Sequence, residues 1–238
     1  MSPSSTVDKP GPGDSETPRF DVFFPAPTGL PPGNGRLGVL GGAYNPITRA
    51  HLRLAHYARE QHKLHEVIFV LPRTLPNKPI VEVSLEHRLQ MMRLGTATFP
   101  YISLGLCSHG LFIDICTGLK QIYPQKPEIF FITGRDAAER ILSWPYTNAA
   151  SVLRDMFANF QMLVFEREGK LDLPENPLIE PYSKRIHTLK IAESLDHISS
   201  TKVRQRLRTG QPIEELVPPE VASYIMDHNL YKKQLDQD

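Results

Sequence analysis

Short runs of apolar residues alternate, from residue 36 onward, with longer segments in which apolar positions recur every three or four residues. A short continuous apolar run is typical of a strand buried on both faces, whereas the wider spacing is typical of an amphipathic helix. The apolar runs predict strands at residues 37–40, 67–71, 102–106, 129–133, 161–165 and 186–191. The amphipathic segments predict helices after residue 48 and over residues 84–98, 112–122, 137–142, 148–157, 200–209 and 219–228.

This alternation predicts an α/β fold, a doubly wound parallel sheet with helices on both faces and a helical C-terminal segment. In such folds ligands bind beyond the carboxyl ends of the strands. The first 35 residues differ, because they hold eight of the 22 prolines and five of the 15 glycines. We therefore expect a flexible N-terminal tail over residues 1–35 and one domain over residues 36–238, although the apolar patch at residues 20–24 could dock onto that domain.

The most informative segment is a glycine loop that follows the first predicted strand, Gly41-Gly42-Ala43-Tyr44-Asn45-Pro46-Ile47-Thr48-Arg49-Ala50-His51. Glycines let a backbone approach a phosphate without a Cβ atom in the way, and Asn45-Pro46 forces a turn. Thr48 then falls at the N-cap of the next helix and His51 in its first turn, where free N–H groups attract an anion. The alternative is an ordinary strand–turn–helix with a capping threonine and a histidine packed on its own helix.

A second phosphate-binding pattern lies about 150 residues later, in Ile198-Ser199-Ser200-Thr201-Lys202-Val203-Arg204. Ser200 or Thr201 is expected to cap a helix, with Lys202 and Arg204 in its first turn. Cations at that end oppose the helix dipole, so a bound polyphosphate explains their placement better than the alternative, solvated side chains on a helix with unfavourable charges. Two such patterns in one small domain indicate a nucleoside triphosphate.

Two features between these blocks are less decisive. Asp136, in the Gly134-Arg135-Asp136 turn after the fourth predicted strand, either binds a ribose hydroxyl pair or caps the next helix. Trp144, the only tryptophan, either stacks on an aromatic base or belongs to the core. His62 and His65 do not indicate zinc, because no third ligand lies at a useful spacing.

Composition excludes several classes of protein. Lysine and arginine number 27 against 26 aspartates and glutamates, and this net charge of +1 gives no reason to expect a nucleic-acid or membrane-surface partner. No apolar run approaches the ~18 residues of a membrane span, and the N-terminus resembles neither a secretory signal nor a typical transit peptide. The two cysteines, Cys107 and Cys116, are expected to be buried thiols of a cytoplasmic protein, because that compartment is reducing.

Together, the two phosphate-binding blocks resemble the (His/Thr)-x-Gly-His nucleotidyltransferase superfamily, and within it the nicotinate or nicotinamide mononucleotide adenylyltransferase family. That family reads Gly-Gly-x-Phe-Asp-Pro-x-His-x-Gly-His in the first block and Ile-Ser-Ser-Thr-x-Ile-Arg in the second. The resemblance covers about residues 36–231 and includes Pro76-Asn77-Lys78, Glu86-His87-Arg88-Leu89 and Arg167-Glu168-Gly169. It implies an enzyme with a Rossmann-like nucleotidyltransferase fold.

The reaction that the resemblance implies is transfer of AMP from ATP to a pyridine mononucleotide, which gives a dinucleotide and pyrophosphate in NAD biosynthesis. The attacking phosphate is already an anion near neutral pH, so catalysis consists of positioning and charge neutralisation. The implied cofactor is Mg²⁺, bound to phosphate oxygens and retaining most of its waters, and no protein metal ligands are expected. The implied partners are ATP and the pyridine mononucleotide, and a homo-oligomer is compatible with the resemblance.

The site residues that the resemblance implies fall into three groups. Those that would act on the phosphates during transfer are Thr48, His51, Lys78 and Arg204. Those that would hold ATP are Gly41, Gly42, Ala43, Tyr44, Gly134, Asp136, Ser200 and Thr201. Those that would hold the acceptor are Asp114, Trp144 and Arg167.

The chain departs from the family pattern in two places. In the first loop Asn45 replaces an aspartate, Thr48 the first histidine and Ala50 a glycine, which would place a methyl group near the phosphates. Threonine at the position of Thr48 also occurs in the related pantetheine-phosphate adenylyltransferases. The bacterial Ser-Tyr-Thr-x-Asp-Thr-Leu segment, which helps to hold the pyridine ring, keeps only Asp114 here. Two alternatives stay open: a transfer in the same fold that uses CTP or another phosphate acceptor, and a non-catalytic nucleotide-binding protein.

Overall fold

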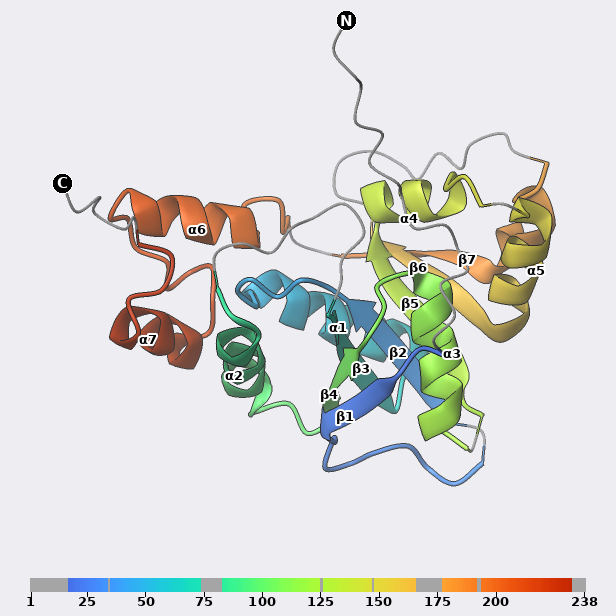
Figure 1. Ribbon diagram of the computed structural model, residues 1–238, viewed down its shortest axis with the longest axis horizontal. Coiled ribbons are helices and arrows are strands. Elements are labelled where there is room, and N and C mark those ends of the chain that lie inside the picture. Colours follow the sequence, from blue (N-terminus) through green and yellow to red (C-terminus); the bar gives the residue numbers. More distant parts are fainter. Residues whose placement is uncertain are drawn as a thin grey trace, which may run out of the picture.

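A seven-stranded sheet forms the centre of the computed structural model, which describes residues 17–33, 35–73, 83–124, 126–146, 148–165, 177–191 and 194–232. The strand order is β1-β4-β3-β2-β5-β6-β7, and every neighbouring pair except β1 and β4 runs parallel. Helices lie on both faces of the sheet (Figure 1). The expected doubly wound α/β fold is therefore confirmed.

The elements follow the predicted pattern closely. The strands are β1 (Phe20–Phe24), β2 (Arg36–Gly41), β3 (Glu66–Pro72), β4 (Ile102–Cys107), β5 (Glu128–Gly134), β6 (Phe160–Phe165) and β7 (Ile186–Leu189). The helices are α1 (Arg49–His62), α2 (Leu85–Thr96), α3 (Phe112–Ile122), α4 (Arg135–Leu142), α5 (Ala149–Asn159), the 3-10 helix η1 (Glu180–Arg185), α6 (Ser200–Arg208) and α7 (Pro219–Asp227). Each strand and helix that the sequence predicted forms within two residues of its expected limits; β1 and η1 were not predicted.

Two apolar layers enclose the sheet, one under α1, α2, α6 and α7 and the other under α3, α4 and α5. Strand β3 shows how one strand serves both layers, because Val67, Phe69 and Leu71 enter the first and Ile68 and Val70 the second. Successive side chains of a strand point to opposite faces, so a strand that is covered on both faces is apolar throughout. This is why the central strands could be recognised as continuous apolar runs.

Strand β1 lies inside the segment that the sequence assigned to the tail. It pairs antiparallel with β4, with Phe20 opposite Cys107. The chain beyond it is also attached, since the backbone N–H of Ala26 donates to the hydroxyl of Ser103 at 2.8 Å. The ordered sheet thus begins at Phe20 and not after residue 35. Of the expected tail, residues 1–16 lie outside the described residues.

The strand order reverses between β2 and β5, which run side by side with Leu40 opposite Ile132. From β2 the chain proceeds to β3 and β4 on one side, and from β5 to β6 and β7 on the other. The loops after β2 and β5 therefore leave the same edge of the sheet, as the sequence predicted for the glycine loop and residues 134–136. A switch point of this kind is where ligands bind in open parallel sheets.

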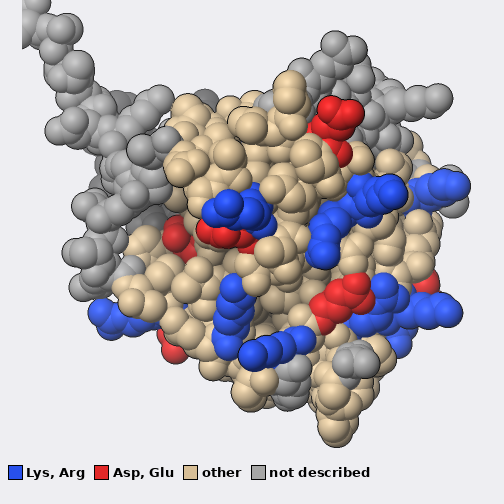
Figure 2. Space-filling model, turned by 90° about the vertical axis from the view of Figure 1, so that its right-hand side faces the viewer, with Lys and Arg blue, Asp and Glu red and all other residues tan. Residues whose placement is uncertain are grey.

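Three observations bear on the expectations that came from composition. Cys107 and Cys116 are buried free thiols, as expected. In the described part of the chain, no helix has the length and apolar character needed to span a membrane. The face on the right of Figure 1 carries side chains of both charge signs among neutral residues (Figure 2), in keeping with the net charge of +1.

Candidate functional site

The loop between β2 and α1 brings a threonine and a histidine into direct contact at the start of a helix. Thr48 is the N-cap of α1, as predicted, and its side chain is fully buried. Its backbone N–H donates to Nδ1 of His51 at 3.1 Å, and its hydroxyl lies 2.7 Å from the same nitrogen. Because a backbone N–H can only donate, Nδ1 accepts, and the proton of the neutral ring sits on Nε2. The loop therefore selects the tautomer in which His51 is a donor through Nε2.

Tyr44 supports this loop from the inside. Its backbone is left-handed, with φ 44°, and its ring is buried against Phe69 at a centroid distance of 5.5 Å. The hydroxyl donates to the carbonyl oxygen of Leu40, and burial raises the pKa of Tyr44 well above its usual value. A Cβ atom at Gly42 would lie 3.2 Å from this ring, so the tyrosine explains the glycine. The Tyr44 side chain thus shapes the loop from its buried side.

Helix α6 holds the carbonyl groups of the same loop. The hydroxyl of Ser200 donates to the carbonyl oxygen of Pro46 at 2.8 Å. The guanidinium of Arg204 donates to the carbonyl oxygen of Asn45 at 2.8 Å and to the hydroxyl of Thr201 at 3.5 Å. The two phosphate-binding blocks, distant in the sequence, are therefore joined in space as one structure.

The N-cap of α6 is Ser199, one residue before the two candidates that the sequence favoured. The Ser199 hydroxyl accepts a hydrogen bond from the backbone N–H of Lys202 at 3.2 Å. The expectation of a cap at Ser200 or Thr201 was therefore wrong. Three consecutive hydroxyl residues are nearly equivalent as caps, so their sequence does not identify which one is used. Because Ser199 caps the helix, the hydroxyl of Ser200 can bind the loop instead.

A buried arginine, which sequence reasoning did not assign to the site, reaches the loop from α2. Arg88 is 5% exposed, and its guanidinium donates to the carbonyl oxygen of Ala43 at 3.3 Å. Its Nε is buried with no hydrogen-bond partner among the described residues. Desolvation lowers the pKa of Arg88, while Tyr231 and Glu86 nearby act to raise it. Arg88 stood in the family resemblance, but only the folded chain brings it beside the loop.

The C-terminal segment contacts the loop at Asn45, one of the positions where this chain departs from the family. The side-chain oxygen of Asn45 accepts a hydrogen bond from the hydroxyl of Tyr231 at 2.6 Å. The backbone N–H of Arg49 donates to the carbonyl oxygen of Leu216 at 2.9 Å. Ala50 is 6% exposed and packs in the core layer under α1.

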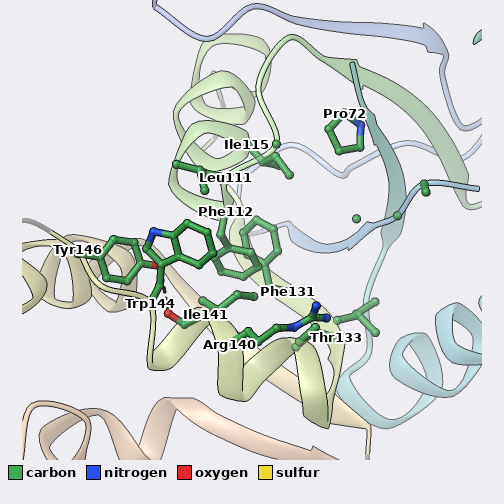
Figure 3. Close-up of a pocket in the computed structure, with 16 residues that line it drawn as sticks. Pro72, Leu111, Phe112, Ile115, Phe131, Thr133, Arg140, Ile141, Trp144 and Tyr146 are labelled. Atoms are coloured by element: carbon green, nitrogen blue, oxygen red, sulfur yellow. Dashed lines mark hydrogen bonds between the residues drawn. The ribbon is translucent and has the colours of Figure 1, made fainter. Parts of the chain in front are cut away.

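A cavity of about 310 Å³ opens beside the glycine loop at the switch point (Figure 3). Gly41, Gly42 and Ala43 form part of its wall, and the rest comes from the start of α3, the end of β5, and α4 with the chain after it. Aromatic side chains gather in one part of the cavity, namely those of Phe112, Phe131, Trp144 and Tyr146. Flat aromatic faces of this kind can stack on a planar ring.

Trp144 lies in the wall of this cavity and is half-buried, so it is not a core residue. The hydroxyl of Tyr146 donates to the carbonyl oxygen of Ile141 at 3.1 Å, and burial raises the pKa of Tyr146 to about 12. This hydrogen bond fixes the tyrosine beside the indole (Figure 3). Of the two interpretations of Trp144, the structure favours the one that leaves its face open to a ligand.

The remaining expected site residues are placed less decisively. The side chain of Asp136, in the first turn of α4, is 82% exposed at the switch-point edge. Asp114, in the first turn of α3, does not line the cavity; burial raises its pKa, and neighbouring His109 acts to lower it. Lys78 and Arg167 lie outside the described residues.

The side chains gathered at the glycine loop suit an anion. Thr48, His51, Arg88 and Arg204 are neutral or cationic and meet the loop from three helices. No group of three or more His, Cys, Asp or Glu side chains in the described ranges could hold a metal ion. These residues do not fit a magnesium ion bound by the protein itself.

Comparison with known proteins agrees with this geometry. The cytidylyltransferase-like family model matches residues 39–206. The chain belongs to this family. It is 33% identical over 205 residues to a probable nicotinate-nucleotide adenylyltransferase of Thermoanaerobacter sp. (strain X514), covering 83% of this chain and 95% of the relative. It is 32% identical over 214 residues to a protein of the same name from Moorella thermoacetica, covering 85% and 94%.

The fold is also similar to that of a solved enzyme. Plasmodium falciparum nicotinic acid mononucleotide adenylyltransferase, complexed with NaAD, aligns with a TM-score of 0.63 and 20% identity over 83% of this chain and 98% of that one. At this identity the likeness shows the fold alone. The family match and the curated relatives confirm that the chain is a nucleotidyltransferase, as the resemblance of the two blocks implied.

Proposed function

We propose that this nucleotidyltransferase transfers AMP from ATP to nicotinate or nicotinamide mononucleotide, giving the dinucleotide and pyrophosphate as a step of NAD biosynthesis. The observation that carries the proposal is the aromatic cavity of about 310 Å³ that opens directly beside the phosphate-binding loop. A planar ring in the cavity would bring a phosphate attached to it up to the loop. The names of the curated relatives, probable nicotinate-nucleotide adenylyltransferases, support the same reaction.

In this reaction an oxygen of the acceptor phosphate forms a bond to the α-phosphorus of ATP. The bond between that phosphorus and the oxygen bridging to the β-phosphate breaks, and pyrophosphate leaves with the electron pair. His51, held by Thr48 with its proton on Nε2, would donate a hydrogen bond to a phosphate oxygen as negative charge shifts onto the leaving group. No general base is required, because the nucleophile is already ionised.

The triphosphate would lie between the glycine loop and α6. Ser200, Thr201 and Arg204 would meet the β- and γ-phosphates, and their contacts with the loop carbonyls or with each other support this placement. Asp136 would bind the ribose of ATP, since its exposed carboxylate lies at the same edge of the sheet. Lys78, which lies outside the described residues, would contact the phosphates as the family resemblance implies. Magnesium, when bound, would be held by phosphate oxygens and water and would neutralise their charge.

Replacing Arg204 with lysine should lower kcat/KM for ATP by roughly 10- to 100-fold, because an ammonium cannot reproduce the planar fork that reaches Asn45 and Thr201. Steady-state kinetics with varied ATP checks this. The matched control is Arg208→Lys, at the exposed far end of the same helix, for which kcat/KM should stay within about twofold of wild type. Equal behaviour of the two variants would contradict the role of Arg204.

Replacing Trp144 with alanine should raise KM for the pyridine mononucleotide by roughly 5- to 100-fold, the usual cost of losing one stacking partner of a base. KM for ATP should change little, because the indole lies in the aromatic part of the cavity. Trp144→Phe keeps a flat ring and should recover most of the loss. A variant that impairs ATP and acceptor alike would contradict the assignment of this cavity to the acceptor.

The proposed reaction is tested with ATP or CTP, Mg²⁺ and each of the two pyridine mononucleotides, by measuring pyrophosphate and dinucleotide together. We expect both products in equal amounts with ATP. Turnover with CTP alone would favour a different nucleotidyl transfer. Binding of ATP and mononucleotide with no product from any combination would overturn the proposal in favour of a non-catalytic relative.

A further inference from the structure

Arg140 stands out in the acceptor cavity because of its charge. Of the sixteen described residues that line the cavity, it alone carries a charged side chain. A phosphate that enters an otherwise apolar cavity loses hydration and needs a compensating donor. The position of Arg140 therefore bears on how the acceptor is held, and this inference rests on the proposed function.

The guanidinium of Arg140 is fixed by its own helix. Its Nε donates to the carbonyl oxygen of Asp136, one turn earlier, at 3.0 Å. Figure 3 shows the guanidinium extended along the cavity toward Thr133 and away from the indole of Trp144. Anchoring through Nε leaves the terminal nitrogens to form the pair of parallel hydrogen bonds that suits a phosphate.

The neighbouring arginine on the same helix shows that this arrangement is particular to Arg140. The Nε of Arg135 lies 3.6 Å from a carboxylate oxygen of Glu139 and 3.9 Å from one of Asp136, so its charge is compensated by acidic neighbours. Arg140 forms no ion pair with any residue in the described ranges, and it lines the cavity while Arg135 does not. One helix thus supplies both a candidate anion-binding residue and its control.

The geometry points to the phosphate of the acceptor mononucleotide as the group that Arg140 binds. Thr133, which the guanidinium approaches, lies at the end of β5, and β5 pairs with β2, the strand that leads into the glycine loop. A pyridine ring among the aromatic side chains therefore directs its phosphate toward Arg140 and the loop together. Arg140 would orient the attacking oxygen and offset part of its charge. A carboxylate on the ring would instead lie at the aromatic end, away from the guanidinium.

The experiment compares Arg140→Gln with Arg135→Gln in the full-length enzyme. We expect Arg140→Gln to raise KM for nicotinate and nicotinamide mononucleotides by the same factor, roughly 10- to 100-fold, the cost of losing hydrogen bonds to a charged group. KM for ATP and the unfolding temperature should remain as in wild type, and Arg135→Gln should change neither KM. In calorimetry, Arg140→Gln should weaken binding of the mononucleotide and leave binding of nicotinamide riboside, which lacks the phosphate, unchanged.

The other outcomes are distinguishable. A loss confined to nicotinate mononucleotide would show that Arg140 binds the ring carboxylate, and a rise in KM for ATP would assign it to the triphosphate; either overturns the inference. A wild-type enzyme that makes dinucleotide, with Arg140→Gln unchanged, would refute the inference and leave the proposed function intact. A wild-type protein that binds no pyridine mononucleotide would overturn both.

Discussion

His51→Ala should lower kcat by roughly 10²- to 10³-fold, the usual loss when one preorganised donor to a developing negative charge is removed. The reason lies in the neighbouring Thr48, whose backbone N–H and hydroxyl both meet Nδ1 and so keep the proton on Nε2. KM values should change much less, because the donor matters most as charge moves onto pyrophosphate. Steady-state and single-turnover rates at saturating ATP and acceptor measure the effect.

Two further variants isolate the role of this imidazole. His56→Ala removes an exposed histidine from the same helix and should leave kcat within about twofold of wild type. Thr48→Val removes the hydroxyl and keeps the backbone N–H, so its loss should be smaller than that of His51→Ala. Near-normal kcat in His51→Ala would remove His51 from the catalytic machinery, and an equal loss in His56→Ala would attribute the effect to helix α1 as a whole.

Phe20→Ala should destabilise the enzyme by about 3–5 kcal/mol, the range for removing a buried phenylalanine side chain. Phe20 is 7% exposed and fills a socket formed by two glycines. A Cβ atom added at Gly105 on β4 would lie 2.6 Å from the ring of Phe20. A Cβ atom added at Gly118 on α3 would lie 2.8 Å from the Cβ atom of Phe20. Because α3 lines the acceptor cavity through Phe112 and Ile115, loosening it should also raise KM for the acceptor. Urea unfolding and steady-state kinetics test both effects.

The control for this prediction is on the same strand. Phe23 is 38% exposed, so Phe23→Ala should cost well under half as much as Phe20→Ala. Gly118→Ala should also lower the free energy of unfolding, by about 1–3 kcal/mol, because the added methyl group overpacks the socket that Phe20 fills. Deletion of residues 1–16 keeps β1, whereas deletion of residues 1–30 removes it and should resemble Phe20→Ala. Equal stability of the two phenylalanine variants would refute the socket.

The sheet could be predicted from the sequence because its central strands are covered on both faces. A short run of mostly apolar residues, such as residues 67–71, already indicates a strand that is covered on both faces, before its neighbours in the sheet are known. Strand β1 could not be recognised in the same way. It sits at the edge, its burial alternates, and Asp21 and the surrounding prolines give its segment the composition of a tail. Its pairing with β4 is a long-range event that no local pattern reports.

In the candidate site, too, the features with a local sequence pattern could be predicted and the long-range contacts could not. The glycine loop and the α6 segment were found because each begins a helix, and helix starts have a local signature. Their direct contact, between Arg204 and a carbonyl 159 residues earlier, was not predicted, because neither segment carries a local signal for the other. Arg88 and Arg140 lie on helices where arginine is common, and nothing in their spacing separates them from solvated cations. Arg88 is distinguished by its burial and Arg140 by its place in the cavity, and both properties exist only in the folded chain.

The hydrogen bond from Tyr231 to Asn45 joins residues 186 positions apart. During synthesis Asn45 leaves the ribosome 186 residues before Tyr231, so the loop is first made without this contact. If the proposed function holds, nascent fragments that end before Tyr231 lack this hydrogen bond to the loop and should bind ATP more weakly than the full-length protein. A ligand that protects the full-length protein from proteolysis should therefore protect such fragments less.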